Sequence, residues 1–322
     1  MPTQIYAHPL DGSTTLPLLR DLLPESIALY GRIQHNFTTP SAILLATFPP
    51  STTPPNCFAI TFLDRALRPE TEAWTYSSIQ SNSSSTRPSC PPNCPSCRHN
   101  ILTIYAHIAN LPIPTSIHAG QTVSENSEYA SHYSNNSILL AGSIDERVKD
   151  ILADVLSPEH IALAHTPYIK YIVPLSNLPA DFPLPDGLSW GTMNTPADVE
   201  FVRERSSIPR QSSTLARLTS VAIWQGERPI AWAYSGVDGS LVSLHVEEDW
   251  RGQGLAKMLS VRLMRMDVEE MGLGHVDVDV ENLASRMVCE SIGGVQGGIV
   301  YWVRIHLDRV VEILGDLENL GG

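Results

Sequence analysis

One stretch of the second half of the chain allows only a narrow set of folds. Residues 240–246 (SLVSLHV) predict a strand, a glycine-rich turn follows, and a helix begins at Gly254 with apolar residues at helical spacing. Residues 275–280 (HVDVDV) then alternate strictly, which predicts a second strand. A strand, helix and strand in this order place the two strands side by side and parallel, through a right-handed crossover.

The turn in this stretch, within WRGQGLAKML (250–259), suits a phosphate. Gly252 and Gly254 relax the backbone so that consecutive N–H groups can point at one spot, and the helix start adds its positive dipole end. The alternative is an ordinary helix start after a solvated loop, which is the commoner meaning of an isolated Gly-x-Gly.

A second helix follows the second strand. Asn282 suits its N-cap, and Gly293 and Gly294 end it. A final strand completes the unit, so we expect a mixed α/β fold of the α+β type.

Composition excludes several classes of protein. The 322 residues carry a net charge of -13, which argues against binding nucleic acids or anionic membranes. No run approaches the ~18 apolar residues of a membrane span, and the first residues resemble no leader. Five cysteines, three of them crowded together, do not make a disulfide framework. We therefore expect a cytoplasmic protein.

The first half indicates a mixed domain. It opens with a helical pattern (13–24) and continues with strand-like runs at 26–34, 41–48, 57–63 and 72–78. A helix is expected within 143–156, and a strand at 168–175. Four prolines from Pro174 to Pro185 indicate a linker, so we expect a boundary between 175 and 187. The expected domains are 1–178 and 187–307, followed by a C-terminal helix at 308–322.

Residues 79–100 form a Ser/Pro/Asn-rich insertion that we expect to be a mobile loop. Cys90, Cys94, Cys97 and His99 offer four zinc ligands within it. Their spacing is compressed, and Pro91 and Pro95 directly follow Cys90 and Cys94, which we expect to oppose convergence of the ligands. We therefore favour a disordered loop and expect no metal site.

The glycine-rich turn resembles the cofactor loop of the GNAT superfamily of acyl-CoA-dependent N-acyltransferases. Arg251, Gly254 and Ala256 fit its R/Q-x-x-G-x-G/A signature. A second block agrees, since Asn282, Ser285 and Gly293 have the spacing of the residues that close the GNAT cofactor site.

The likeness is closer to the glycine N-acyltransferase branch. ERPIAWAY, EEDWRGQGL and VDVDVEN are similar to three of its segments, and LPESIALYGRIQHNF is similar to its amino-terminal region. This implies a degenerate N-terminal GNAT-like half followed by an active C-terminal GNAT domain.

The resemblance also implies the site. Acetyl-CoA or another acyl-CoA would be the co-substrate, with no metal required, and main-chain groups of Leu244 through Val246 would pair with the pantetheine arm and polarise the thioester. The backbone of the cofactor loop would hold the pyrophosphate: Arg251, Gly252, Gln253, Gly254, Leu255 and Ala256, with Asn282 and Ser285 closing the site.

Two side chains, Cys289 and His245, are candidates for the proton transfers. Cys289 occupies the slot where many GNAT enzymes keep a tyrosine as general acid; it is a candidate proton donor or, as we favour, a core residue. Ser240 stands where the related branch has its glutamate base, and a serine cannot accept the proton of an ammonium. His245 is the nearest candidate base, unless it packs on the other face of its strand.

We therefore expect an acyl-CoA-dependent N-acyltransferase in which the amine of a small molecule, such as an amino acid, attacks the thioester directly. Two alternatives remain open: a non-catalytic CoA-binding protein of GNAT fold, and a protein lysine acetyltransferase. Asp277, Asp279 and Glu281 would attract the cationic acceptor of the latter.

Overall fold

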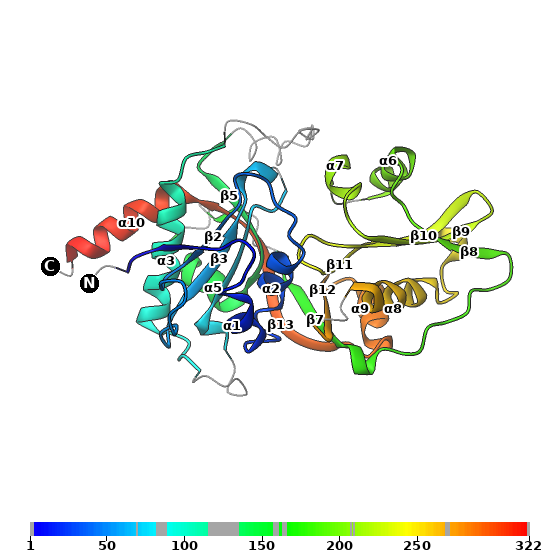
Figure 1. Cartoon of the computed structure of the whole chain (residues 1–322), viewed down its shortest axis with the longest axis horizontal. Helices are drawn as coiled ribbons and strands as arrows, with labels where there is room; N and C mark the ends of the chain where they lie inside the picture. Colours follow the sequence, from blue (N-terminus) through cyan, green and yellow to red (C-terminus); the bar gives the residue numbers. More distant parts are fainter. Residues whose placement is uncertain are drawn as a thin grey trace. The chain divides into compact units, whose positions relative to one another are not determined.

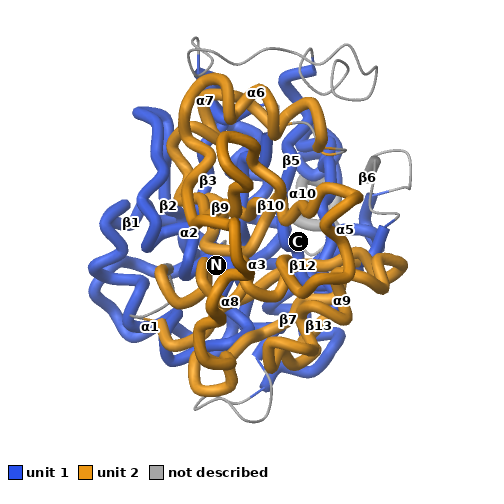
Figure 2. The backbone as a smooth tube through the Cα atoms, turned by 90° about the vertical axis from the view of Figure 1, so that its right-hand side faces the viewer, with its two compact units in different colours: residues 1–119, 123–167, 299–322 blue, residues 120–122, 168–298 orange. Residues whose placement is uncertain are grey.

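The computed structural model is mixed α/β, which confirms the predicted class, and its chain divides into two compact units (Figures 1 and 2). The first comprises residues 1–119, 123–167 and 299–322, and the second contains 168–298. The structure describes residues 3–68, 70–81, 89–114, 135–156, 161–162, 166–206, 208, 210–267 and 271–320. None of the helices in these ranges is long and apolar enough to cross a membrane.

The first unit is built on a sheet whose strands run in the order β1-β2-β3-β4-β5-β13, with β6 added to β13. All of its neighbouring strands are antiparallel except β4 and β5, which are parallel. The strands are β1 (Tyr6–His8), β2 (Ile43–Ala46), β3 (Ala59–Leu63), β4 (Ala73–Ser77), β5 (Ile138–Asp145), β6 (Ile161–Ala162) and β13 (Val295–His306).

Helices accompany this sheet. They are α1 (Leu16–Arg20), α2 (Ile27–Gln34), α3 (Pro95–Ala109), α5 (Glu146–Ala153) and α10 (Leu307–Leu320), with the short turns η1 (Arg65–Leu67) and η2 (Ser78–Gln80). The main core of the unit is formed by residues of α3, α5, β5 and β13, and α10 packs against α3.

The second unit contains a four-stranded antiparallel sheet, in the order β11-β10-β9-β8, and the antiparallel pair β7 and β12. Its strands are β7 (Tyr168–Pro174), β8 (Leu188–Gly191), β9 (Ser220–Gln225), β10 (Arg228–Ser235), β11 (Leu241–Val246) and β12 (Leu273–Asp279). Its helices are α6 (Pro196–Arg205), α7 (Ser212–Leu215), α8 (Leu255–Asp267) and α9 (Leu283–Ser291), with η3 (Leu175–Asn177) and η4 (Glu248–Trp250). Within this unit, α6 and α7 lie on one side of the four-stranded sheet and α8 on the other (Figure 1).

The compact units do not begin and end where the proline-rich composition predicts a domain boundary, because strands that are distant in the sequence pair with one another. The strand β7 precedes the expected linker, yet it pairs along its whole length with β12 and so belongs to the second unit. The end of β13 pairs with β5 and belongs to the first unit, as does α10. A proline-rich segment therefore does not coincide with the division between the compact units.

The strand expected at 26–34 is wrong, because these residues form α2. The helix is buried almost all round, so its apolar residues show no single helical face. Even Arg32 is fully buried, with its guanidinium 4.0 Å from the centre of the Phe62 ring. Burial on every side removed the periodicity that distinguishes a helix from a strand.

The disordered loop expected at 79–100 is also wrong for part of its length. The helix α3 begins at Pro95, with proline at its first position as helix starts favour. Cys94 and Cys97 are buried in the core of the first unit. Residues 82–88 of this segment lie outside the described residues.

Candidate active site

The predicted glycine turn connects β11 and α8 in the second unit. Gly252 and Gly254 have φ angles of 76° and 80°, in the left-handed region that glycine adopts without strain. A Cβ atom added to either would meet no heavy atom within 4 Å. The loop therefore faces open space at the two positions where a ligand would approach the backbone.

Backbone donors of this loop are free to bind such a ligand. Within the part of the chain that the structure describes, the N–H groups of residues 252–257 donate no hydrogen bond. The first turn of a helix has no internal acceptors for its N–H groups, and its dipole favours an anion there. The loop and the start of α8 thus fit the pyrophosphate of a CoA thioester.

The edge of β11 that faces away from β10 carries further main-chain groups. The N–H of Glu247 donates to the carbonyl of Ile230 on β10 at 2.9 Å, so by alternation the groups of Leu244 and Val246 face the opposite edge. Between β11 and β12, only an isolated parallel bridge, Ser240 to His275, is present among the described residues. The two strands therefore meet at one end and leave the edge at Leu244 and Val246 unpaired by β12.

Two features shape this edge. The register between β10 and β11 shifts between Trp232 and Tyr234, and Ser243 has a φ of 51°, as in a β-bulge. The Arg251 side chain returns to the strand, where its Nε donates to the Val246 carbonyl at 3.1 Å. The arginine thus ties the cofactor loop to the end of β11.

The second predicted block caps α9. The Asn282 Oδ1 accepts a hydrogen bond from the backbone N–H of Ser285 at 3.0 Å, as expected of an N-cap. Gly293 ends the segment with a φ of 88°, and a Cβ there would lie 2.7 Å from the Asn177 carbonyl oxygen. Only glycine fits this position.

His245 lies on the α6 side of the sheet. Its ring stacks on Trp232, with centroids 4.4 Å apart and planes 14° apart, and Trp232 in turn contacts Phe201 of α6. Burial lowers the pKa of His245 below its usual 6.5, although the nearby Glu247 carboxylate acts in the opposite direction. The imidazole is therefore neutral at pH 7 and able to accept a proton.

Cys289 lies in the interior of the second unit, with 2% of its surface exposed. Burial raises the pKa of its thiol to about 12. An ordinary thiol, such as the one a CoA thioester releases, has a pKa of ~8.5, so this cysteine holds its proton too tightly to protonate it. Its position favours packing over proton donation.

The structure reveals a buried polar cluster that the sequence did not indicate. The hydroxyl of Ser240 donates to the Asp238 carboxylate at 2.6 Å, and the His275 ring contacts the Asp238 carbonyl oxygen through Nε2 at 3.0 Å. Burial alone would raise the pKa of Asp238, but His275, the Ser240 hydroxyl and Lys170 together lower it. A carboxylate thus stands two residues from the slot of the related branch's glutamate.

The acidic surface proposed for a cationic acceptor is smaller than expected. The Asp277 carboxylate is buried and pairs with the Lys170 ammonium at 2.7 Å. The Asp279 carboxylate accepts the backbone N–H of Glu281 at 2.8 Å. Asp277 is therefore already neutralised inside the unit.

A family model places these features in context. The description of that model is the acyl-CoA N-acyltransferase verG N-terminal domain, and it matches residues 2–171. The chain belongs to this family. The predicted resemblance to acyl-CoA-dependent N-acyltransferases is thereby confirmed at the level of this family, and the chemistry that the family's description names is acyl transfer from acyl-CoA. The match covers the N-terminal part of this chain, whereas the candidate site lies within 168–298.

Solved structures are similar to this chain at low sequence identity. An X-ray structure of a Drosophila protein is 11% identical, covers 94% of this chain and 98% of that chain, and has a TM-score of 0.59. A GCN5-related N-acetyltransferase from Sphaerobacter thermophilus is 12% identical, with 94% and 95% covered and a TM-score of 0.49. A tandem GNAT protein from the clavulanic acid biosynthesis pathway is 12% identical, with 94% and 98% covered and a TM-score of 0.47. No curated protein matches the chain.

Proposed function

We propose that this acyl-CoA N-acyltransferase transfers an acetyl or other acyl group from acyl-CoA to the amine of a small molecule, such as an amino acid, and that the reaction takes place in the second unit. The observation that carries the proposal is the set of N–H groups at residues 252–257, which have no acceptor among the described residues, beside the edge of β11 that β12 leaves unpaired. These are the two main-chain elements that a CoA thioester requires, one for its pyrophosphate and one for its pantetheine arm and carbonyl.

The Val246 edge supports polarisation of the thioester. A backbone N–H directed at the carbonyl oxygen stabilises the negative charge that develops there, and one good donor contributes roughly 3 kcal/mol to lowering the barrier. The amine then attacks directly, without a covalent enzyme intermediate. Cys289 is not required as a nucleophile, because its thiol is buried and its pKa is raised to about 12.

His245 is the proposed proton acceptor, either directly or through water. Its ring is half-buried, neutral at pH 7 and fixed against Trp232 on the side of the sheet that α6 covers. An aliphatic amine with a pKa of ~10.4 is mostly protonated at neutral pH, so an acceptor is needed before or during attack. Ser240 does not fill this role, since its hydroxyl already donates to Asp238.

Release of the free CoA thiol tests the proposal. The full chain is incubated with acetyl-CoA and longer acyl-CoAs, each with glycine, other amino acids, polyamines or lysine peptides. We expect thiol release that depends on a small amine and a new amide in the product mass. Rapid transfer to lysine peptides alone would favour a protein lysine acetyltransferase.

Calorimetry with CoA, combined with the thiol assay, distinguishes an active acyltransferase from a non-catalytic CoA-binding protein. Binding of CoA without thiol release from any amine would indicate a CoA-binding protein that has lost catalysis. Absence of CoA binding would contradict the proposed site itself.

A further inference from the structure

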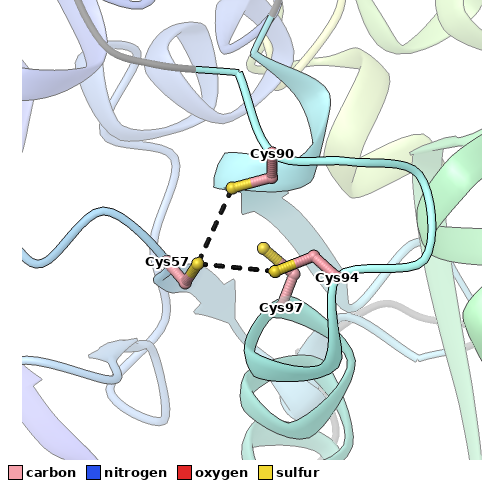
Figure 3. Close-up of side chains that lie close together, drawn as sticks. All are labelled: Cys57, Cys90, Cys94 and Cys97. Carbon is pink, nitrogen blue, oxygen red and sulfur yellow. Dashed lines mark hydrogen bonds between the residues drawn. The ribbon is translucent and has the colours of Figure 1, made fainter.

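Four cysteines converge in the first unit, whereas the residues proposed for acyl transfer belong to the second. The sulfur atoms of Cys57, Cys90, Cys94 and Cys97 all lie within 4.8 Å of one another, and Figure 3 shows their side chains pointing toward a common centre. The sequence grouped three of them with His99, but the fourth member is Cys57, which stands 33 residues before Cys90. The fourth cysteine therefore joins the cluster because the folded chain brings it there, and the local spacing of the other three does not reveal it.

The distances fit a metal better than a disulfide. The Cys57 sulfur lies 3.7 Å from that of Cys90 and 3.6 Å from that of Cys94. Four sulfurs bound ~2.3 Å from a tetrahedral zinc ion lie ~3.8 Å apart, whereas disulfide sulfurs are ~2.05 Å apart. Cys57 is also nearly equidistant from two partners, although it can form a disulfide with only one.

Rigid elements hold the four side chains. Cys94 is the N-cap of α3 and Cys97 lies in its first turn, while Cys57 stands two residues before the start of β3. The Cys57 carbonyl accepts a hydrogen bond from the Asn100 side chain of α3 at 2.9 Å. The geometry of the cluster therefore depends on the packing of a strand against a helix, which is well ordered in a protein core.

The prolines favour the convergence that they were expected to prevent. The N–H of Cys94 donates to the Pro91 carbonyl at 3.0 Å, which closes a turn between Cys90 and the helix. Pro95 occupies the first position of α3. Because proline fixes φ at a value suited to turns and helix starts, these residues preorganise the loop that carries Cys90 and Cys94.

The surroundings suit thiolate ligands of a cation. The start of α3 directs its positive dipole end at Cys94 and Cys97, and the Ser78 hydroxyl lies 3.5 Å from the Cys97 sulfur. Cys94 and Cys97 are buried, and a divalent cation offsets the cost of burying a thiolate, because it binds the sulfur and displaces the proton.

We propose that Cys57, Cys90, Cys94 and Cys97 bind one structural Zn²⁺ ion. Four protein ligands leave no open coordination position, so the ion has no direct part in acyl transfer. Zinc binding by four thiols forms four Zn–S bonds and releases up to four protons, with no change of oxidation state. The ion joins the segment before β3 to the start of α3, and its effect is on the stability of the first unit.

The zinc content of the full chain tests this directly. The protein is expressed in zinc-supplemented medium, purified without chelators and analysed by mass spectrometry of metals. We expect about one zinc ion per chain, and tetrahedral thiolate absorption bands when Co²⁺ replaces it. Zinc far below one per chain, together with no Co²⁺ spectrum after reduction and metal addition, would overturn the proposal.

A matched pair of variants locates the ion. Cys90→Ser removes a ligand that is only half-buried, and Cys289→Ser alters a buried cysteine of the other unit. We expect Cys90→Ser to lose most of its zinc and Cys289→Ser to keep it. Equal zinc content in both variants would place the metal elsewhere.

A measurement on the unmodified protein covers the case in which Cys90→Ser does not fold. Thiol titration of the native chain should show four more reactive thiols after a strong chelator is added, and the Tm should fall. A chain mass lower by two hydrogens, with no metal and no chelator effect, would show a disulfide instead and overturn the zinc site.

Discussion

The imidazole of His245 lies almost flat against the indole of Trp232, with ring centroids 4.4 Å apart. Adjacent strands place the two residues opposite each other, since Trp232 on β10 pairs with His245 on β11. Trp232 is almost fully buried, so the face of the imidazole that it covers is closed to water. The stack both fixes the ring and keeps it neutral.

The first prediction concerns the pH dependence of acyl transfer. Burial holds the pKa of His245 below 6.5, so the ring accepts a proton above that pKa and loses this ability as the pH falls through it. We expect the kcat/KM of the wild type to decline on the acidic side of 6.5. His245→Ala should flatten this limb and lower kcat/KM roughly a hundredfold. Initial rates against pH with one acyl-CoA and amine pair provide the test, and an unchanged profile would leave water as the acceptor.

The second prediction concerns CoA affinity. Gly254→Val places a side chain in the open space beside the free N–H groups, where the pyrophosphate would approach. Gly226→Val is a matched control, because Gly226 also has a positive φ (58°) and open space around it, but lies in the turn between β9 and β10. Both variants should lose about 1–2 kcal/mol of stability from backbone strain. Calorimetry should show weaker CoA binding only for Gly254→Val; equal affinities would mean that the site is misplaced.

The third prediction concerns Ser240, whose hydroxyl donates to the buried Asp238 carboxylate at 2.6 Å. Ser240→Ala removes this donor and should lower the free energy of unfolding by about 1–3 kcal/mol, while kcat changes little. Ser240→Glu restores the residue of the related branch but sets a second carboxylate beside Asp238. We expect it to destabilise the protein further without raising the rate. Urea unfolding measures the stability of both variants, and initial rates measure their activity. A Ser240→Glu enzyme that is faster than the wild type would contradict the prediction.

The fourth prediction concerns stability in mild acid. Burial lowers the pKa of His275, whose Nε2 lies 3.0 Å from a carbonyl oxygen and whose Nδ1 has no hydrogen-bond partner within the described ranges. Lys170 also lowers this pKa, and Asp238 and Asp277 oppose the shift. The native ring is therefore neutral. Below pH ~6.5 the unfolded chain binds a proton that the native chain does not, so the free energy of unfolding should fall by about 1.4 kcal/mol per pH unit until the native pKa is reached.

His275→Gln provides the comparison, because its amide can keep the hydrogen bond and does not titrate. Urea unfolding between pH 7.5 and 5.5 should show a smaller pH dependence for this variant than for the wild type. Parallel slopes for the two proteins would show that another group is responsible.

Local signals in the sequence determined much of the second unit. The turn at Gly252 and Gly254 and the Asn282 cap were both predicted, because each depends on the conformational preference of a few neighbouring residues. The helix expected within 143–156 is present as α5 for the same reason. Its apolar residues form one face, and the pattern survives since the other face is exposed.

Only the tertiary structure decided the features that join distant segments. Cys57 meets the cysteines of α3, and the pairing of β7 with β12 places residues 168–174 in the second unit. The buried helix α2 lacked a periodic signal, because it is enclosed on every side. His275 and Asp238 form one polar cluster beside the parallel bridge between Ser240 and His275, which brings together residues 37 positions apart. Composition and local periodicity reflect interactions between residues that are near one another in the sequence. The contacts described here join distant segments, so they depend on which segments pack together in the folded chain.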